Sequence, residues 1–385
     1  MMKRIAVFLM TMTMVMPAVA QLGDDGFYRI QNAKSKWFAT VVDNKAENKD
    51  VTSTTNIDLY AINTREADNV MSDPGSVFYI ERKGTNDYIL RAQGMDTYEL
   101  TNMYLKTSSS NEIAGAYYLY GRDNSSSMTR LLKEDYNTSF NFYYVATTTL
   151  AGRSDESCSW NIIPVTDAEG QYIGVEADIE VDGKYYSTLY TSFAYRLSKG
   201  MKANYIRQCN GQMAEMMEIG GNAVPEKTPV IIECSSNKAA DNRITPLKDN
   251  QDGIVQNQLN GVFFRNVLKW SDKTEATGHP NWNATNYDAT TMRVLGMVNG
   301  KLAFVKDEDL DYLPANKAYL MVNSSAAANI ELVGTDKYPS GINDLKTEKN
   351  TSKKSIYSLT GEKVSRENVP TGVYVIDGKK TIIRR

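Results

Sequence analysis

Short runs of alternating apolar and polar residues cover most of the chain after about residue 20. These runs are rich in tyrosine, valine, threonine and isoleucine, and clusters of Asn, Asp, Gly and Ser separate them, which is typical of β-strands joined by tight turns. No later segment keeps an apolar period of 3.6 residues over three turns, as an amphipathic helix would. The pattern therefore predicts an all-β protein.

The first twenty residues have a different character. Two basic residues precede an apolar run over 5–16, and a small-residue pattern ends at Ala20. This arrangement is typical of a signal peptide over 1–20, cleaved between Ala20 and Gln21. A membrane anchor is the alternative, but the run contains threonines and is shorter than the roughly 20 apolar residues that a bilayer requires. No later stretch is apolar enough to predict a transmembrane segment.

Charge and cysteine content narrow the possible partners. A net charge of −3 gives no general attraction for nucleic acid or anionic lipid, so neither is an expected partner. Three cysteines allow at most one internal disulfide. Cys209 and Cys234 fall in the same predicted domain and form the candidate pair, whereas buried free thiols are the alternative.

An internal repeat is suggested in the first part of the chain. Similar aromatic strand endings occur at 77–80, 116–119 and 159–163, roughly forty residues apart. A strand, a turn and a second strand open the region at 26–39, and a comparable hairpin follows the first ending at 87–94.

These segments resemble a ricin-B-like β-trefoil, a family of three pseudo-equivalent units that frequently bind carbohydrate. The resemblance covers residues 23–165 and implies a β-trefoil-like domain there. The Gln-x-Trp triplet of ricin-type repeats is absent, and only Trp160 is retained. Trp37, Tyr88 and Tyr117 are the candidate ligand-binding residues, because flat rings with polar edges stack on pyranose faces. Packing of these aromatic side chains into the barrel core is the alternative for each of them.

The second predicted domain spans 166–333 and is expected to be β-sandwich-like. It contains two similar segments, at 224–232 and 313–320, in which a proline-containing turn precedes an apolar strand. The paired pattern resembles a module of large surface proteins from Gram-negative bacteria that use type IX secretion. A connector rich in Lys, Asn, Ser, Thr and Gly follows at 334–354.

The tail, 355–385, is predicted to be a small three-strand β-meander with hairpin turns at 360–361 and 377–378. It resembles the last part of the type IX secretion C-terminal sorting domain, which implies the export machinery as a partner. The expected location is then the outside or outer surface of a Gram-negative cell, with the periplasm as the alternative. The residues that carry this resemblance are Gly361, Pro370, Gly372, Tyr374 and Gly378.

Few residues suggest catalysis or metal binding. His279 is the only histidine, which excludes a zinc site with two imidazoles. Cys158 and His279 follow the chain order of papain-like proteases without the signature around the cysteine, so a surface histidine and a half-buried cysteine are the favoured interpretation. Acidic residues at 307–311 and 249–253 do not match calcium-loop spacing, and solvated turns are favoured. We predict no catalytic residue, metal or cofactor.

The sequence favours a non-catalytic secreted or cell-surface protein that binds a glycan or another surface protein. One alternative is a glycan or peptide hydrolase that uses two carboxylates in a cleft. Another is a structural protein of an outer-surface layer.

Overall fold

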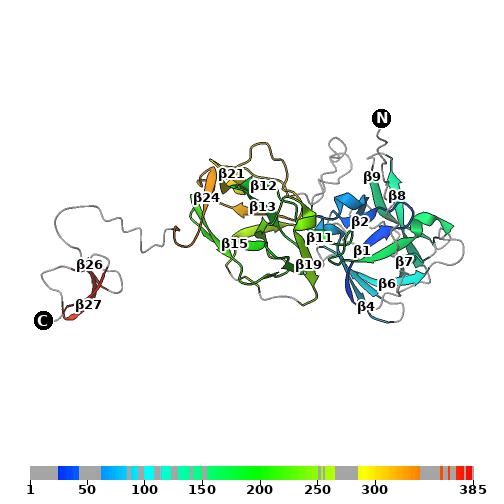
Figure 1. The fold of residues 1–385 in the computed structure, drawn as a ribbon, viewed down its shortest axis with the longest axis horizontal. Coiled ribbons are helices and arrows are strands. Elements are labelled where there is room, and N and C mark those ends of the chain that lie inside the picture. The colour runs from blue at the N-terminus through cyan, green and yellow to red at the C-terminus, as the bar shows by residue number, and fades with distance from the viewer. Residues whose placement is uncertain are drawn as a thin grey trace, which may run out of the picture. The chain divides into compact units, whose positions relative to one another are not determined.

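The computed structural model contains two compact units, Met1–Asp336 and Lys337–Arg385. In the described ranges every regular element is a β-strand or a short 3₁₀ turn, which confirms the all-β prediction (Figure 1). No helix in these ranges has the length and apolar character needed to cross a bilayer. The described residues are 25–42, 62–84, 88–93, 99–107, 113, 115–122, 129–138, 142–149, 154–249, 253–254, 256–264, 285–338, 356–358, 363–364, 370–376 and 379–383.

A strongly curled ten-stranded sheet forms the first half of the larger unit. Its order is β10-β1-β2-β3-β9-β8-β7-β6-β5-β4, with further pairings β1–β4 and β10–β7. Because β1 pairs with strands from both ends of this order, the sheet closes on itself as a half-barrel (Figure 1). Its strands are β1 (Gly26–Asn32), β2 (Phe38–Val41), β3 (Ile62–Arg65), β4 (Phe78–Arg82), β5 (Tyr88–Arg91), β6 (Glu99–Thr107), β7 (Tyr117–Arg122), β8 (Thr129–Asn137), β9 (Phe142–Thr149) and β10 (Trp160–Pro164).

Three aromatic residues from the predicted strand endings pack in the core of the half-barrel, although each begins a strand instead of ending one. Phe78, Tyr117 and Trp160 begin β4, β7 and β10, and all three belong to one buried cluster. Trp160 is fully buried, and its indole N–H donates to the carbonyl of Leu132 at 3.0 Å. A buried indole usually needs such a partner, so this bond fixes the ring orientation.

A buried arginine ties β1 to the 3₁₀ turn before β4, η2 (Pro74–Ser76). The guanidinium of Arg29 donates to the Ser76 hydroxyl at 3.0 Å and to the Val70 carbonyl at 3.1 Å. Burial lowers the pKa of Arg29 to about 10, against the opposing effect of Asp73. The group therefore remains a cation at neutral pH.

The second half of the larger unit contains two further sheets, of order β11-β19-β14-β17 and β12-β13-β18-β15-β16-β24-β22-β21-β23-β20. All pairings are antiparallel except β16–β24. The strands are β11 (Ile173–Gly174), β12 (Ile179–Val181), β13 (Lys184–Leu189), β14 (Ala194–Leu197), β15 (Lys202–Cys209), β16 (Met213–Glu218), β17 (Ala223–Val224), β18 (Val230–Cys234), β19 (Arg243–Leu247), β20 (Leu259–Val262), β21 (Met292–Val298), β22 (Lys301–Val305), β23 (Lys317–Met321) and β24 (Asn329–Val333).

Strand β18 supplies both hydrophobic cores of this second half. Ile232 packs in one cluster with Tyr195, whereas its neighbour Ile231 packs in another cluster with Phe304. Successive side chains of a strand point to opposite faces, so β18 is covered on both sides. This explains its nearly continuous apolar sequence, Val-Ile-Ile-Glu-Cys.

Buried amide hydrogen bonds join the two halves along what we call the seam. Gln93 donates through Nε2 to the carbonyl of Phe263 at 2.6 Å, and Asn316 donates through Nδ2 to Gln93 Oε1 at 2.6 Å. Asn316 also donates to the carbonyl of Tyr190 at 3.0 Å and has a left-handed backbone with φ 58°. Asparagine tolerates that conformation better than most residues. The predicted boundary at residue 165 lies inside this joined unit.

Apolar residues also cross the seam. Phe264 belongs to the core of the half-barrel, and Val77 belongs to a core of the second half. A backbone hydrogen bond from Gly174 to the carbonyl of Met71, 2.9 Å long, adds a main-chain link. The halves therefore share parts of their cores, unlike two domains on a flexible linker.

The predicted Cys209–Cys234 disulfide is absent, and both residues are free thiols. Strand register explains this, because Lys202 of β15 lies opposite Glu233 of β18. Cys209 is seven positions beyond Lys202, roughly 20 Å along a strand, whereas bridged Cα atoms lie about 4.4–6.8 Å apart. Burial raises the pKa of Cys234 to about 12, so its thiol stays protonated at neutral pH.

The smaller unit is a four-stranded sheet of β25 (Ile356–Ser358), β26 (Lys363–Val364), β27 (Gly372–Ile376) and β28 (Lys379–Ile383). Its order is β26-β25-β27-β28, which corrects the predicted three-strand meander. Ile356 lies opposite both Val364 and Ile376, so the first strand is central and β26 forms an edge. The predicted turns at 360–361 and 377–378, with Gly361 and Gly378, lie outside the described residues.

Three of the predicted tail residues come together around one tyrosine. The Tyr374 hydroxyl donates to the carbonyl of Pro370 at 3.1 Å, and its side chain is buried with Ile356. A Cβ on Gly372 would lie 3.3 Å from the Tyr374 ring, so the ring covers the glycine on the same strand face. The Pro-x-Gly-x-Tyr pattern thus has a local packing role.

We predict that Gln93→Ala lowers the free energy of unfolding of the larger unit by about 2 kcal/mol, because it leaves the buried amide of Asn316 without its acceptor and the Phe263 carbonyl without its donor. Chemical denaturation of the two proteins measures this difference. Gln256→Ala, at an exposed position, is the matched control and should change little. An equal, small effect of both substitutions would contradict a stabilising seam.

Candidate functional site

Two exposed tyrosines and a half-buried tryptophan lie together where two hairpins of the half-barrel meet. Trp37 follows the turn between β1 and β2, and Tyr136 and Tyr143 belong to the β8–β9 hairpin. The rings of Trp37 and Tyr143 are 4.8 Å apart at 71°, and those of Tyr136 and Tyr143 are 4.7 Å apart at 47°. We refer to these three residues as the aromatic cluster.

Local hydrogen bonds hold Trp37 in place. Asn32 accepts backbone N–H bonds from Lys34 and Ser35 at its side-chain oxygen, at 3.0 and 3.2 Å. Such an Asn-based turn reverses the chain without help from other strands. The Ser35 hydroxyl then accepts from the backbone N–H of Trp37 at 3.2 Å, and Lys36 adopts a left-handed φ of 67°. The sequence of the turn therefore aims the indole toward β9.

The β8–β9 register explains why the two tyrosines are exposed together. Tyr136 lies opposite Tyr143, and Glu134 lies opposite Val145. Residues two apart on a strand share a face, so Leu132, Glu134 and Tyr136 form one row. Leu132 and Val145 are buried in the core, whereas Tyr136 and Tyr143 are 39% and 37% exposed. The cluster therefore continues the core outward to the surface.

Glu134 lies between the core and the aromatic cluster. Its side chain is buried and accepts a hydrogen bond from the Ser35 hydroxyl at 2.9 Å, which links the two hairpins. Burial raises the pKa of Glu134, against the hydrogen bond from Ser35 and the positive charge of Lys34. The site thus combines aromatic rings, a lysine and a poorly solvated carboxyl group.

Of the three candidate residues from the sequence, the structure places only Trp37 in this cluster. Tyr88 and Tyr117 are 4% and 5% exposed and pack in the core of the half-barrel. Their position matches the core-packing alternative. Sequence reasoning missed Tyr136 and Tyr143; the signal would have been one tyrosine before, and an aromatic run after, the polar residues 137–139.

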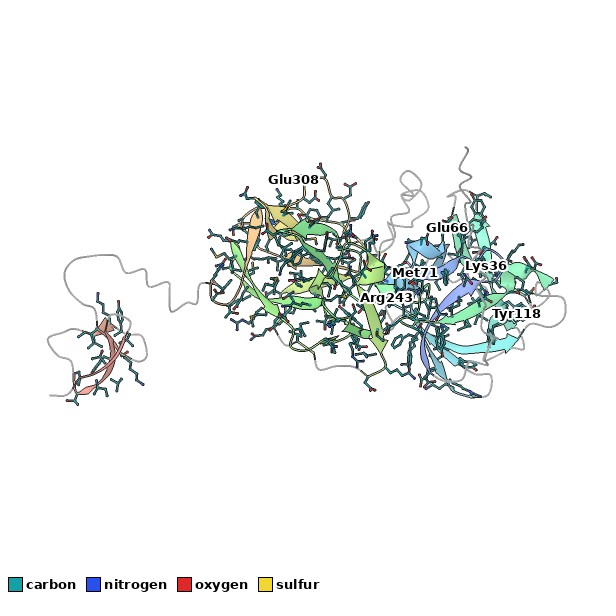
Figure 2. All side chains as sticks on the ribbon, viewed as in Figure 1. Lys36, Glu66, Met71, Tyr118, Arg243 and Glu308 are labelled. Atoms are coloured by element: carbon teal, nitrogen blue, oxygen red, sulfur yellow. The ribbon has the colours of Figure 1, made fainter. Side chains whose placement is uncertain are left out.

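The other chemical candidates show ordinary structural roles where they are described. Cys158 is fully buried, instead of half-buried as predicted, and packs with Tyr118 and Leu131. Glu308, at the outer edge of the second half, pairs with Lys306 at 2.6 Å (Figure 2). Within the described residues, no group of three or more His, Cys, Asp and Glu side chains is arranged to hold a metal. His279 lies outside them.

Comparison with protein-family models, curated proteins and solved structures found no match to this chain. The chemistry of the site is therefore derived from its own geometry. The aromatic cluster offers flat apolar rings with hydroxyl groups at their edges, a surface that stacks on another flat apolar face while donating and accepting hydrogen bonds.

We predict that Glu134→Gln removes a pH-dependent component of stability. A carboxyl whose folded-state pKa is raised contributes stability below its unfolded pKa, here the ordinary 4.5, and loses it as pH rises through the folded value. As pH rises from acid to neutral, the wild type should therefore lose stability that Glu134→Gln does not lose. The free energy of unfolding of the variant should increase relative to that of the wild type over this range. Denaturant titrations across this range measure it.

Glu66→Gln, at an exposed position, is the control for removal of one surface carboxylate. If both substitutions give the same pH profile, Glu134 is not the group responsible.

Proposed function

We propose that this is an exported, non-catalytic binding protein whose half-barrel is a β-trefoil-type module that binds glycans. The observation that carries the proposal is the aromatic cluster, in which half-buried Trp37 packs against exposed Tyr143 and Tyr136 on two hairpins that a hydrogen bond joins. Rings held at an angle by their neighbours lose little conformational freedom on binding, which favours their use as contact groups.

Pyranose chemistry fits this surface. One face of many sugars presents aliphatic C–H groups that pack on an aromatic ring, and the ring edge presents hydroxyls that need polar partners. Tyrosine hydroxyls and the ammonium group of Lys34, an exposed residue of the adjoining turn, supply such partners. A protein ligand would use the same aromatic rings. If glycans do not bind in the test below, a protein ligand becomes the favoured interpretation.

Three equivalent turns support the β-trefoil interpretation. A turn closed by a backbone hydrogen bond between residues three positions apart precedes each of three strands. Each of these strands then begins with a buried aromatic residue. The bonds are Val77 to Pro74 at 3.1 Å, Ala116 to Ile113 at 3.2 Å and Ser159 to Glu156 at 3.0 Å, before Phe78, Tyr117 and Trp160 respectively.

Two of these turns are capped in the same way. Asp73 accepts from the backbone N–H of Gly75 at 2.9 Å, and Asp155 accepts from that of Ser157 at 3.0 Å. Each aspartate stands five positions before its buried aromatic residue. The pairing of β1 with both β4 and β10 closes the sheet, which is compatible with a barrel.

The proposal for export rests on the two ends of the chain. A signal peptide over 1–20 would direct the protein across the inner membrane, and a sorting-type tail over 355–385 would direct it through a type IX-like system to the surface of a Gram-negative cell. The second half, a β-sandwich-like domain in this interpretation, would then support the binding module. The packing of Pro370, Gly372 and Tyr374 supports the tail as a folded unit.

We predict that the mature protein binds a related set of glycans on an array and that Trp37→Ala weakens this binding about tenfold or more. By analogy with bases stacked on aromatic side chains, loss of one stacking ring removes roughly 1–3 kcal/mol of binding free energy. A change of about 1.4 kcal/mol corresponds to a tenfold change in affinity. Tyr143→Ala should act in the same direction, because Tyr143 contacts both other rings.

Tyr205→Ala, a half-buried tyrosine of β15, is the matched control and should leave binding unchanged. A blank array with well-folded protein would remove the glycan hypothesis, and retained surface attachment would then favour a structural or protein-binding role.

We predict that deletion of 355–385 leaves the protein in the periplasm of a Gram-negative host that has type IX secretion. Fractionation followed by immunoblotting measures its location. Tyr374→Ala should reduce surface delivery in the same assay, since it removes the buried contact of the tail. Unchanged delivery of the deleted form would contradict a sorting role.

A further inference from the structure

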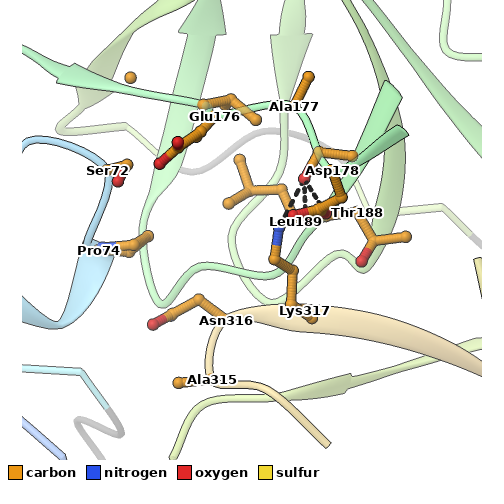
Figure 3. Close-up of a pocket in the computed structure, with 13 residues that line it drawn as sticks. Ser72, Pro74, Glu176, Ala177, Asp178, Thr188, Leu189, Ala315, Asn316 and Lys317 are labelled. Atoms are coloured by element: carbon orange, nitrogen blue, oxygen red, sulfur yellow. Dashed lines mark hydrogen bonds and ion pairs between the residues drawn. The ribbon is translucent and has the colours of Figure 1, made fainter. Parts of the chain in front are cut away.

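A pocket of about 260 Å³ lies at the seam, on elements separate from the aromatic cluster (Figure 3). The half-barrel contributes Ser72 and Pro74. The second half contributes the segment 174–178, the end of β13 and the residues that lead into β23. Its size suits a ligand as large as an amino acid or a monosaccharide, smaller than the ligands of typical drug-sized sites.

Three polar groups in the pocket form a closed triangle. The Lys317 ammonium donates to Asp178 Oδ2 at 2.5 Å and to the Ser187 hydroxyl at 2.6 Å. The Ser187 hydroxyl in turn donates to Asp178 Oδ2 at 2.7 Å. Ser187 is fully buried, so it is no accessible nucleophile. An ammonium group has three N–H donors, and this triangle uses two of those of Lys317.

Glu176 adds a second carboxylate to the same pocket. It is exposed, and the described residues offer it no hydrogen-bond or ion-pair partner. Figure 3 shows its carboxylate extending into the space between Ser72 and the Asp178–Lys317 pair. Two carboxylates and one ammonium give the pocket a net charge of −1. A ligand with a cationic hydrogen-bond donor would balance this charge.

We propose that this pocket binds a small compound in which a primary ammonium group stands next to an oxygen-bearing carbon. The ammonium would pair with Glu176, and the neighbouring oxygen would accept the remaining N–H of Lys317. Amino sugars and free amino acids share this chemistry. Binding here goes beyond the proposed glycan binding and does not depend on it, because no residue of the aromatic cluster lines the pocket.

The polar triangle gives the selectivity a physical basis. Asp178 holds the Lys317 ammonium, so the lysine presents a donor without repelling a cation as strongly as a free charge would. A neutral ligand of the same shape loses the charged hydrogen bond to Glu176, which is the stronger kind. Acetylation of the amine should therefore abolish recognition.

The test is isothermal titration of the mature protein with D-glucosamine and with glycine at slightly acid pH, with N-acetyl-D-glucosamine as the neutral control. We expect at least one ammonium probe to bind about tenfold or more tightly than the control, the worth of one charged hydrogen bond. Glucosamine alone would identify the amino-sugar class, and glycine alone the amino-acid class.

Glu176→Gln should weaken this binding about tenfold or more without lowering the melting temperature, since Glu176 is exposed and has no hydrogen-bond or ion-pair partner among the described residues. Glu180→Gln, an exposed carboxylate four positions further that does not line the pocket, is the matched control and should have no effect. Trp37→Ala should also have none, which separates this pocket from the aromatic cluster. Absence of binding by both ammonium probes, equal binding of the acetylated sugar, or full binding by Glu176→Gln would overturn the proposal.

Discussion

The buried amide pair of Gln93 and Asn316 is the interaction on which the arrangement of the larger unit depends. Gln93 is fully buried, and its side chain connects the carbonyl of Phe263 to the side chain of Asn316. A buried amide without a hydrogen-bond partner costs more free energy than the hydrogen bond contributes when it is made. Any other arrangement of the two halves would break these bonds, so the halves are held in one geometry. The shared cores around Phe264 and Val77 follow from that geometry.

The same pair shapes the chemistry at the seam. The left-handed backbone of Asn316 reverses the chain directly before Lys317, whose ammonium then reaches Asp178 and Ser187. Asn316, which joins the two halves through its side chain, thereby also positions the Lys317 ammonium in the pocket through its backbone. The aromatic cluster has a different origin, because it extends one face of the β8–β9 hairpin beyond the core. One surface suits neutral stacking and the other suits charge recognition, and each rests on a separate rigid element.

Burial of polar groups distinguishes structural from functional candidates in this chain. Arg29, Trp160 and Ser187 each have hydrogen-bond partners inside the protein and act as supports. Glu176, by contrast, reaches solvent without a partner among the described residues. Groups whose bonding capacity the fold does not use are those available to a ligand.

The sequence by itself determined the all-β class, because its period of two and its turn residues act locally. It also marked the aromatic segments at Phe78, Tyr117 and Trp160 by their similar composition and spacing, whereas their meeting in one buried cluster is a tertiary contact. Only the tertiary structure decided which aromatic residues face solvent, since an alternating pattern fixes two faces without saying which is inside. Register between distant strands separated Cys209 from Cys234, and the packing of the sheets brought Glu176 and Lys317 into one pocket. Such pairings join residues far apart in the chain, and their geometry comes from the packing of whole sheets.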